Sequence, residues 1–231
     1  MATRGATTVT AHDFLEAALT IARRAADTQL PVIRAAATAI ADTLERRSKF
    51  SVFGSGHSHL MAEEVWGRAG GLVDVHPILE PALMLHEGLE KSSRLEKLTG
   101  LAAEILAVHG VSDGDCVLVV SNSGRNAVPV EIAMCAREIG ATVIALTSLQ
   151  HSRSVASRAP SGARLFEVAD IVIDNCGVPG DAIMPHHPHA LGPTSTAVGA
   201  LLLQAMMYEV VLDLEARGVT VATYQSLNVG P

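Results

Sequence analysis

The chain has 231 residues, of which 48% are hydrophobic and only 3% aromatic, so it contains enough apolar material for one sizeable core. Its 17 basic and 24 acidic residues give a formal net charge of −7. Because no run of basic residues occurs, the charge excludes nucleic acid and anionic membrane surfaces as partners held by bulk attraction.

Three cysteines, Cys116, Cys135 and Cys176, form no CxxC pair, and the first two lie in apolar runs. This pattern favours reduced thiols over a disulfide framework or a zinc site. The first twenty residues are polar and then amphipathic, unlike a secretory signal, and no uninterrupted apolar stretch reaches membrane-spanning length. These features predict a cytoplasmic protein without a membrane partner.

The first predicted elements are helices within residues 11–48, after a start at residues 1–10 that we expect to be disordered. Apolar residues recur at helical spacing from Phe14 to Ala25, and again from Leu30 to Leu44. Pro31 suits the first turn of a helix. Helices therefore precede the first strand.

Short apolar runs then alternate with helical patterns through residues 49–216. Strands are predicted at 50–53, 72–75, 116–120, 142–146 and 171–173, and helices near 94–109, 127–139 and 194–215. This alternation predicts an α/β fold, a three-layer αβα doubly wound parallel sheet in a single domain. Residues 217–231 form a tail, and the Pro-, Gly- and His-rich residues 179–193 are interpreted as a loop that crosses a site.

The first loop whose residues could bind a ligand is Gly-Ser-Gly-His-Ser at residues 54–58. It follows a predicted strand and begins a helix. Its backbone amides and the Ser58 hydroxyl suit an anion. By itself this loop is weak evidence, because any strand-to-helix turn favours Gly and Ser. The third glycine of a dinucleotide fingerprint is missing, and the loop has no P-loop lysine.

A second loop, Ser-Asn-Ser-Gly-Arg-Asn at residues 121–126, again follows a predicted strand. In an open α/β sheet the loops at the carboxyl ends of strands line the ligand crevice. The two loops are therefore expected to hold a phosphorylated small molecule from two sides. Thr147 and Ser148, at the end of the next strand, extend the same polar rim.

These motifs, in this order, resemble the sugar isomerase (SIS) domain family over residues 50–215. The resemblance implies a phosphosugar ligand without metal or cofactor, and subunits paired as a homodimer or homotetramer with shared sites. It implies that the phosphate lies near Ser58, Ser121, Ser123 and Asn126, although Asn126 replaces the Thr or Ser often found there. The other predicted binding residues are Ser55, His57, Asn122, Thr147 and Ser148.

Two segments resemble different branches of the family. Residues 64–68, Glu-Val-Trp-Gly-Arg, are similar to the phosphoheptose isomerases, whose catalytic base precedes the same Gly-Arg pair, which implies Glu64 as the base. Residues 86–90, His-Glu-Gly-Leu-Glu, are similar to the N-acetylmuramic acid 6-phosphate etherases, which implies Glu87 as a second catalytic carboxylate beside His86. A carboxylate suits removal of the C2 proton of a sugar phosphate. A solvated helix position is the alternative for Glu64, and a helix-start carboxylate for Glu87.

The positions of the histidines help to distinguish between the possible reactions. His186, His187 and His189 lack the spacing of a helical ligand pair and have no nearby cysteine, so we expect their loop to cover the sugar and not to bind a metal. The isomerase branch carries a second catalytic histidine on its final helix, but residues 194–215 contain none. This departure favours elimination over isomerisation.

The resemblance is nearest to SIS proteins likened to N-acetylglucosamine 6-phosphate dehydratase. The predicted function is therefore a phosphosugar lyase that dehydrates N-acetylglucosamine 6-phosphate by C2 deprotonation and loss of the C3 hydroxyl. The alternatives are an aldose–ketose isomerase of the phosphoheptose type and a non-catalytic sugar-phosphate sensor. A transcription factor is disfavoured, because the residues before Phe50 include no basic recognition helix.

Overall fold

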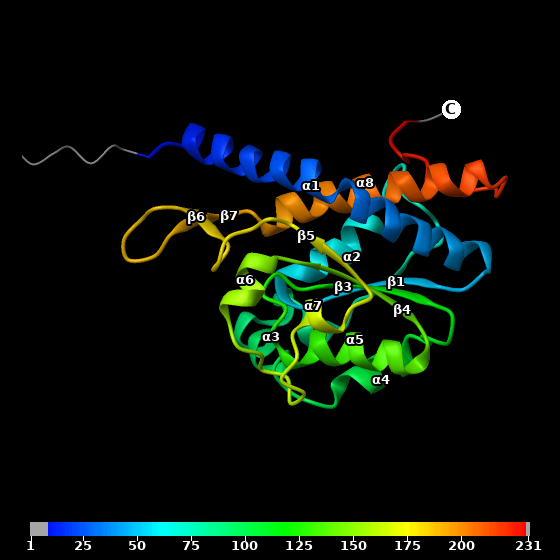
Figure 1. Ribbon diagram of the computed structural model, residues 1–231, viewed down its shortest axis with the longest axis horizontal. Coiled ribbons are helices and arrows are strands. Elements are labelled where there is room, and N and C mark those ends of the chain that lie inside the picture. Colours follow the sequence, from blue (N-terminus) through cyan, green and yellow to red (C-terminus); the bar gives the residue numbers. More distant parts are fainter. Residues whose placement is uncertain (1–8, 230–231) are drawn as a thin grey trace, which may run out of the picture.

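A five-stranded parallel sheet in the order β2-β1-β3-β4-β5 forms the centre of the protein. The computed structural model describes residues 9–229, so most of the predicted disordered start lies outside the described residues. Helices cover both faces of the sheet (Figure 1), which confirms the predicted α/β fold. The strands are β1 (Phe50–Gly54), β2 (His76–Ile78), β3 (Cys116–Val120), β4 (Thr142–Thr147) and β5 (Ile171–Asp174).

Side-chain alternation along β3 divides the core into two layers. Cys116, Leu118 and Val120 face the first layer, and Val117 and Val119 face the second. The first layer holds α1 (Ala11–Glu45), α2 (Leu60–Val65) and α8 (Ser195–Ala216). The second holds α4 (Leu101–Val108), α5 (Ala127–Ile139) and α7 (Leu165–Val168), with α3 (Leu89–Leu95) and α6 (Leu149–Ser154) nearer the carboxyl edge of the sheet. Burial on both faces explains why the strands read as continuous apolar runs.

The N-terminal region is one helix of 35 residues, where the sequence suggested more than one. Thr10 caps α1 by accepting a hydrogen bond from the Asp13 amide, and the Asp13 carboxylate accepts one from the Thr10 amide in return. Pro31 lies inside α1 and does not begin a new helix. The helix continues through it because α1 packs along α8, which supplies tertiary stabilisation that outweighs one missing backbone hydrogen bond.

Two predicted boundaries are wrong. The second strand is His76–Ile78 and not 72–75, because Leu72 instead forms an antiparallel bridge with Thr223 of the C-terminal tail. The helix predicted near 94–109 is two helices, α3 and α4, since Gly100 takes a left-handed conformation with φ of 83° between them.

Residues 179–193 contain a hairpin where a loop was predicted. Strands β6 (Ala182–Met184) and β7 (Leu191–Pro193) pair antiparallel and project beside the N-terminal half of α1 (Figure 1). Its tip carries the three clustered histidines, all exposed.

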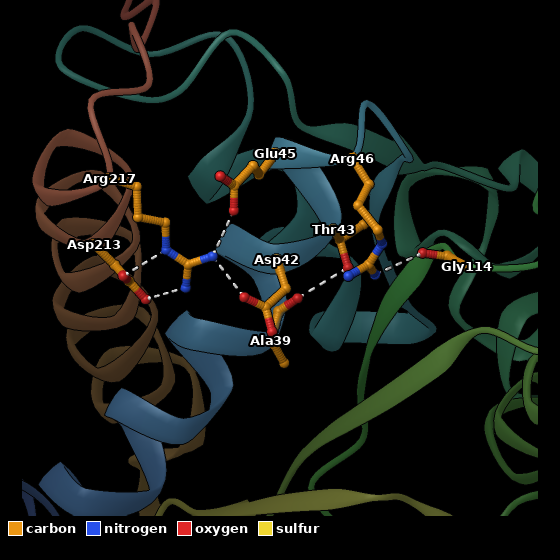
Figure 2. A network of polar contacts seen from close by, with 8 residues as sticks. All are labelled: Ala39, Asp42, Thr43, Glu45, Arg46, Gly114, Asp213 and Arg217. Carbon is orange, nitrogen blue, oxygen red and sulfur yellow. Dashed lines mark hydrogen bonds and ion pairs between the residues drawn. The ribbon is translucent and has the colours of Figure 1, made fainter.

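Helix α8 is long and apolar enough to cross a membrane by length and composition, although Gln204 and Glu209 interrupt its apolar run. In this fold it packs between α1, α2 and the sheet, and 44% of its apolar window is buried. Its end is fixed to α1 by Arg217, which bonds Asp213, Asp42 and Glu45 at 2.6–3.0 Å (Figure 2). These hydrogen bonds, Asp213 first, raise the pKa of the Arg217 guanidinium further above its usual value.

Candidate functional site

The two loops predicted to hold a ligand begin side by side. Gly54 of β1 pairs with Val120 of β3, so the residues that follow each strand leave the sheet at the same edge. Gly54 has no room for a side chain, because an added Cβ would lie 2.3 Å from the Ser58 carbonyl oxygen. Gly124 has φ of +57°, which suits glycine, and an added Cβ there would lie 2.9 Å from Ser152 Oγ. Both glycines therefore keep the loops folded tightly onto the sheet edge.

A cleft of about 330 Å³ lies between these loops. A smaller hollow of about 20 Å³ adjoins it, shares His57, Ser58 and Asn122, and reaches Ser195 and Thr196 of α8. Among the described residues, no lysine or arginine lines either space. The lining is instead rich in hydroxyls and amides: Ser55, Gly56, His57, Ser58, Leu85, Leu89, Ser92, Ser93, Glu96, Ser121, Asn122, Ser123, Asn126 and His151.

A carboxylate that the sequence analysis did not single out joins the two loops. Glu96, at the end of α3, accepts hydrogen bonds from Ser55 Oγ at 3.0 Å and from Asn126 Nδ2 at 2.8 Å. Ser55 and Asn126 are both buried. Arg158 Nη1 donates to Asn126 Oδ1 at 3.0 Å, so both the amide nitrogen and the amide oxygen of Asn126 are hydrogen-bonded within the protein. Only the tertiary fold brings Glu96 here, since nothing in its local sequence marks it as a loop partner.

Three predicted binding residues form hydrogen bonds that stabilise the second loop or the chain next to it. Thr147 Oγ1 donates to the Asn122 carbonyl at 3.2 Å, and Ser148 Oγ donates to the Gly177 carbonyl at 2.6 Å. Both side chains are fully buried and neither lines the cleft. The Asn122 side-chain oxygen accepts from Asn175 Nδ2 at 2.9 Å, which fixes its orientation at the cleft wall. Thr147 and Ser148 therefore position the loop in this structure.

The hydroxyls of Ser58 and Ser123 have no partner among the described residues, and both side chains line the cleft. Ser121 is more constrained, because its Oγ accepts from the Gly124 amide at 3.2 Å. His57 lines both spaces and is exposed. Ser58 and Ser123 are therefore the hydroxyls best placed to meet a ligand.

The predicted catalytic residues lie outside the lining of the cleft in the single chain. Glu64, on α2, forms an ion pair with Arg68 and accepts from Gln204 Nε2 of α8 at 3.0 Å. Glu87 is exposed and lies 3.5 Å from Lys91 Nζ. Neither carboxylate lines the cleft or the adjoining hollow, and their catalytic roles stay predictions.

Two groups of histidines named in the sequence analysis lie outside the lining of the cleft in the single chain. His86 is exposed, with its ring centroid 6.0 Å from that of buried His59, and does not line the cleft. His186, His187 and His189 lie on the exposed hairpin tip and line no part of it either. Across residues 9–229, no cluster of three or more His, Cys, Asp or Glu side chains is arranged to hold a metal ion.

His151 lines the cleft and was not considered in the sequence analysis. It lies on α6, a short helix that the hydropathy pattern did not predict, and its backbone amide donates to the capping Ser148 hydroxyl at 3.1 Å. Burial lowers the pKa of its imidazole. A histidine between Gln150 and Ser152 in a short helix offers no sequence signal for this position.

Sequence comparisons agree with the fold. The model of the SIS domain family matches residues 13–148. A UPF0309 protein of Halalkalibacterium halodurans is 44% identical over 205 residues, which cover 88% of this chain and 85% of that protein. A UPF0309 protein of Listeria innocua is 40% identical over 220 residues, covering 94% and 89%. The matches to the two relatives extend over nearly the whole chain, and the family model covers more than half of it.

Solved structures share the same architecture at low sequence identity. A phosphoheptose isomerase from Francisella tularensis has a TM-score of 0.60 and 19% identity, with 88% of this chain and 100% of that chain covered. The Vibrio vulnificus NanR protein, solved in complex with ManNAc-6P, has a TM-score of 0.53 and 16% identity, with 92% and 66% covered. At these identities the likeness concerns the fold.

Proposed function

The chain belongs to the UPF0309 family of SIS-domain proteins, and we propose on that premise that its cleft binds a phosphosugar. The observation that carries the proposal is the pair of hydroxyl-rich loops that leave β1 and β3 at one edge and enclose the cleft. A cleft without cationic side chains among its described lining residues suits a phosphate held by hydroxyls and backbone amides.

The fold likeness supports a sugar phosphate as the ligand class. One similar structure is described as a phosphoheptose isomerase, and another contains ManNAc-6P. The volume of about 330 Å³ is within the range of small-molecule sites. We place the phosphate against residues 121–126, with the sugar extending towards His57 and Ser58.

For the reaction, we propose dehydration of N-acetylglucosamine 6-phosphate in its open-chain form. Glu64 removes the C2 proton, the electron pair forms a C2–C3 double bond, and the C3 hydroxyl leaves as water after taking a proton from an acid, which we assign to Glu87. The products are an unsaturated aldehyde and one water, so atoms balance without any cofactor. This assignment requires a second subunit to bring the carboxylates to the cleft.

Incubation with N-acetylglucosamine 6-phosphate in deuterated water, followed by NMR and mass spectrometry, tests the reaction. Loss of one water is the expected result. If deuterium appears at C2 and the sugar keeps all its oxygens, the reaction is isomerisation or proton exchange and not elimination. If the sugar binds but does not change, the result favours the sensor function.

Ser123→Ala is expected to weaken binding of the sugar phosphate about five- to tenfold, the loss typical of one hydrogen bond. Ser123 lines the cleft and is partly exposed, so its removal leaves the packing intact. Calorimetric titration measures the change. Ser161→Ala, in an exposed turn outside the lining, is the matched control. Equal affinities for the two variants would move the phosphate away from the second loop.

We also propose that a second copy covers α8. Leu201 and Tyr208 are 60% and 66% exposed, and together with Leu212 they form an apolar stripe beside Gln204, the residue that contacts Glu64. A copy that covers this stripe would also enclose Glu64. The exposed stripe supports the homo-oligomer with shared sites that the sequence predicts.

The double variant Leu201→Glu, Tyr208→Glu is expected to shift the protein to monomer, because charges in an apolar interface are costly. Size-exclusion chromatography with light scattering measures the mass. Val108→Glu is the control, since Val108 is 82% exposed on α4, on the opposite layer of the fold. A wild-type monomer, or an oligomer that survives both stripe substitutions, would contradict this interface.

A further inference from the structure

His151 is a titratable side chain of the cleft with no role in the proposed reaction. It lines the cleft together with Ser121, Ser123 and Asn126 of the second loop, where we place the phosphate. Its own backbone is anchored, because its amide donates to Ser148 Oγ and Ser148 Oγ in turn donates to the Gly177 carbonyl. The ring is therefore carried by a fixed turn at the phosphate end of the cleft.

The two nitrogens of the ring differ in their surroundings. Nδ1 of His151 is enclosed and has no hydrogen-bond partner within the described part of the chain. An enclosed nitrogen without an acceptor is far better accommodated as a lone pair than as an N–H group, because a buried unpaired donor loses its hydration without compensation. The proton of the neutral ring therefore belongs on Nε2, the other nitrogen of a side chain that lines the cleft.

We infer that His151 is a ligand-binding residue, which stays neutral and donates an Nε2–H hydrogen bond to an oxygen of the sugar phosphate. This inference rests on the proposed function and adds to it a recognition residue that the serine-rich loops alone do not supply. A neutral donor recognises phosphate without a requirement for acid conditions.

The charged groups near the ring agree with this state. Burial and the cationic Arg125 both lower the pKa of His151, whereas Asp181, which caps the start of α8, raises it. Burial is the largest cause, so the net shift is downward. Because its pKa lies below the ordinary value of an imidazole, the ring is mainly uncharged at pH 7 and above.

Two substitutions separate hydrogen bonding from shape. His151→Ala removes the donor and is expected to weaken binding of N-acetylglucosamine 6-phosphate about tenfold, whereas His151→Gln keeps an N–H group near the Nε2 position and should stay within about threefold of wild type. Calorimetric titration at several pH values measures the affinities. The ratio of wild-type to His151→Ala affinity should stay constant from about pH 7 to 8, because the ring stays neutral above its lowered pKa. Thermal unfolding checks that both variants fold, and His109→Gln, at the end of α4, is the matched control.

Nitrogen NMR of the protein with labelled histidine reads the ring state directly, with the signal assigned by its loss in His151→Ala. We expect a protonated Nε2 and an unprotonated Nδ1 from about pH 7 to 8, and a shift of the Nε2 signal on addition of the sugar phosphate. A ring that becomes cationic in this range, a proton on Nδ1, or full affinity in His151→Ala would overturn the inference alone. If the wild type binds no sugar phosphate, the proposed function fails and the inference falls with it.

Discussion

Replacing Glu64 by glutamine is expected to lower turnover of N-acetylglucosamine 6-phosphate by about a hundredfold or more, while its affinity stays within about twofold of wild type. Glutamine keeps the shape of the side chain and can still contact Gln204 and Arg68, but it cannot accept the C2 proton. Loss of a positioned general base typically costs a factor of about 10² to 10⁴. A fall in the turnover number without a change in binding therefore identifies a base.

Glu63→Gln is the matched control for this prediction, because Glu63 precedes Glu64 on the same helix and is exposed, and its ion-pair partner among the described residues is His59, at 3.8 Å. It should retain full turnover. Steady-state rates of the two variants, measured on the oligomer, decide the assignment. Equal rates for Glu64→Gln and the wild type would remove Glu64 from the mechanism and return the search to the cleft, where Glu96 is the carboxylate among the lining residues.

Glu96→Ala is expected to lower the free energy of unfolding by about 1–3 kcal/mol and to reduce phosphosugar affinity as well. The substitution leaves the buried Ser55 hydroxyl and the Asn126 amide without their shared acceptor. Because these residues belong to different loops, both loops lose a fixed position at once. Denaturant unfolding and calorimetric titration measure the two effects.

Conservative replacement sharpens the same test. Glu96→Gln can accept from Asn126 Nδ2 and donate to Ser55 Oγ, so it should recover most of the stability. Glu104→Ala, an exposed change on α4, should stay within about 0.5 kcal/mol of wild type. Full stability and affinity in Glu96→Ala would mean that the two loops hold their positions independently of this bridge.

The local sequence predicted the sheet well, because its strands are buried on both faces and read as apolar runs. Residues 116–120 match β3, and residues 127–139 match α5. Failures occurred where tertiary contacts override the local pattern. Pro31 was compatible with a helix start, yet the packing of α1 on α8 carries the helix through it.

The candidate site likewise has some features that the local sequence predicts and others that depend on tertiary contacts. Glycines and serines after two strands predicted the loops at the sheet edge, since parallel strands end at a common edge. Glu96 and His151 belong to elements that are distant in sequence from the two loops, so no motif in the loops predicts that they line the cleft. Thr147 and Ser148 follow a strand as predicted, but their hydroxyls bond to neighbouring carbonyls beneath the loop. Whether a polar side chain at a strand end faces the ligand or its own loop depends on packing.

The central claim is that the cleft between the two loops holds a sugar through its phosphate. Calorimetric titration of the wild-type protein with N-acetylglucosamine 6-phosphate, and in parallel with N-acetylglucosamine, tests it most directly. We predict that the phosphate ester binds and that the unphosphorylated sugar binds at least about a hundredfold more weakly, as expected when several charge-assisted hydrogen bonds are lost. Equal affinity for the two sugars, or binding of neither, would contradict the account.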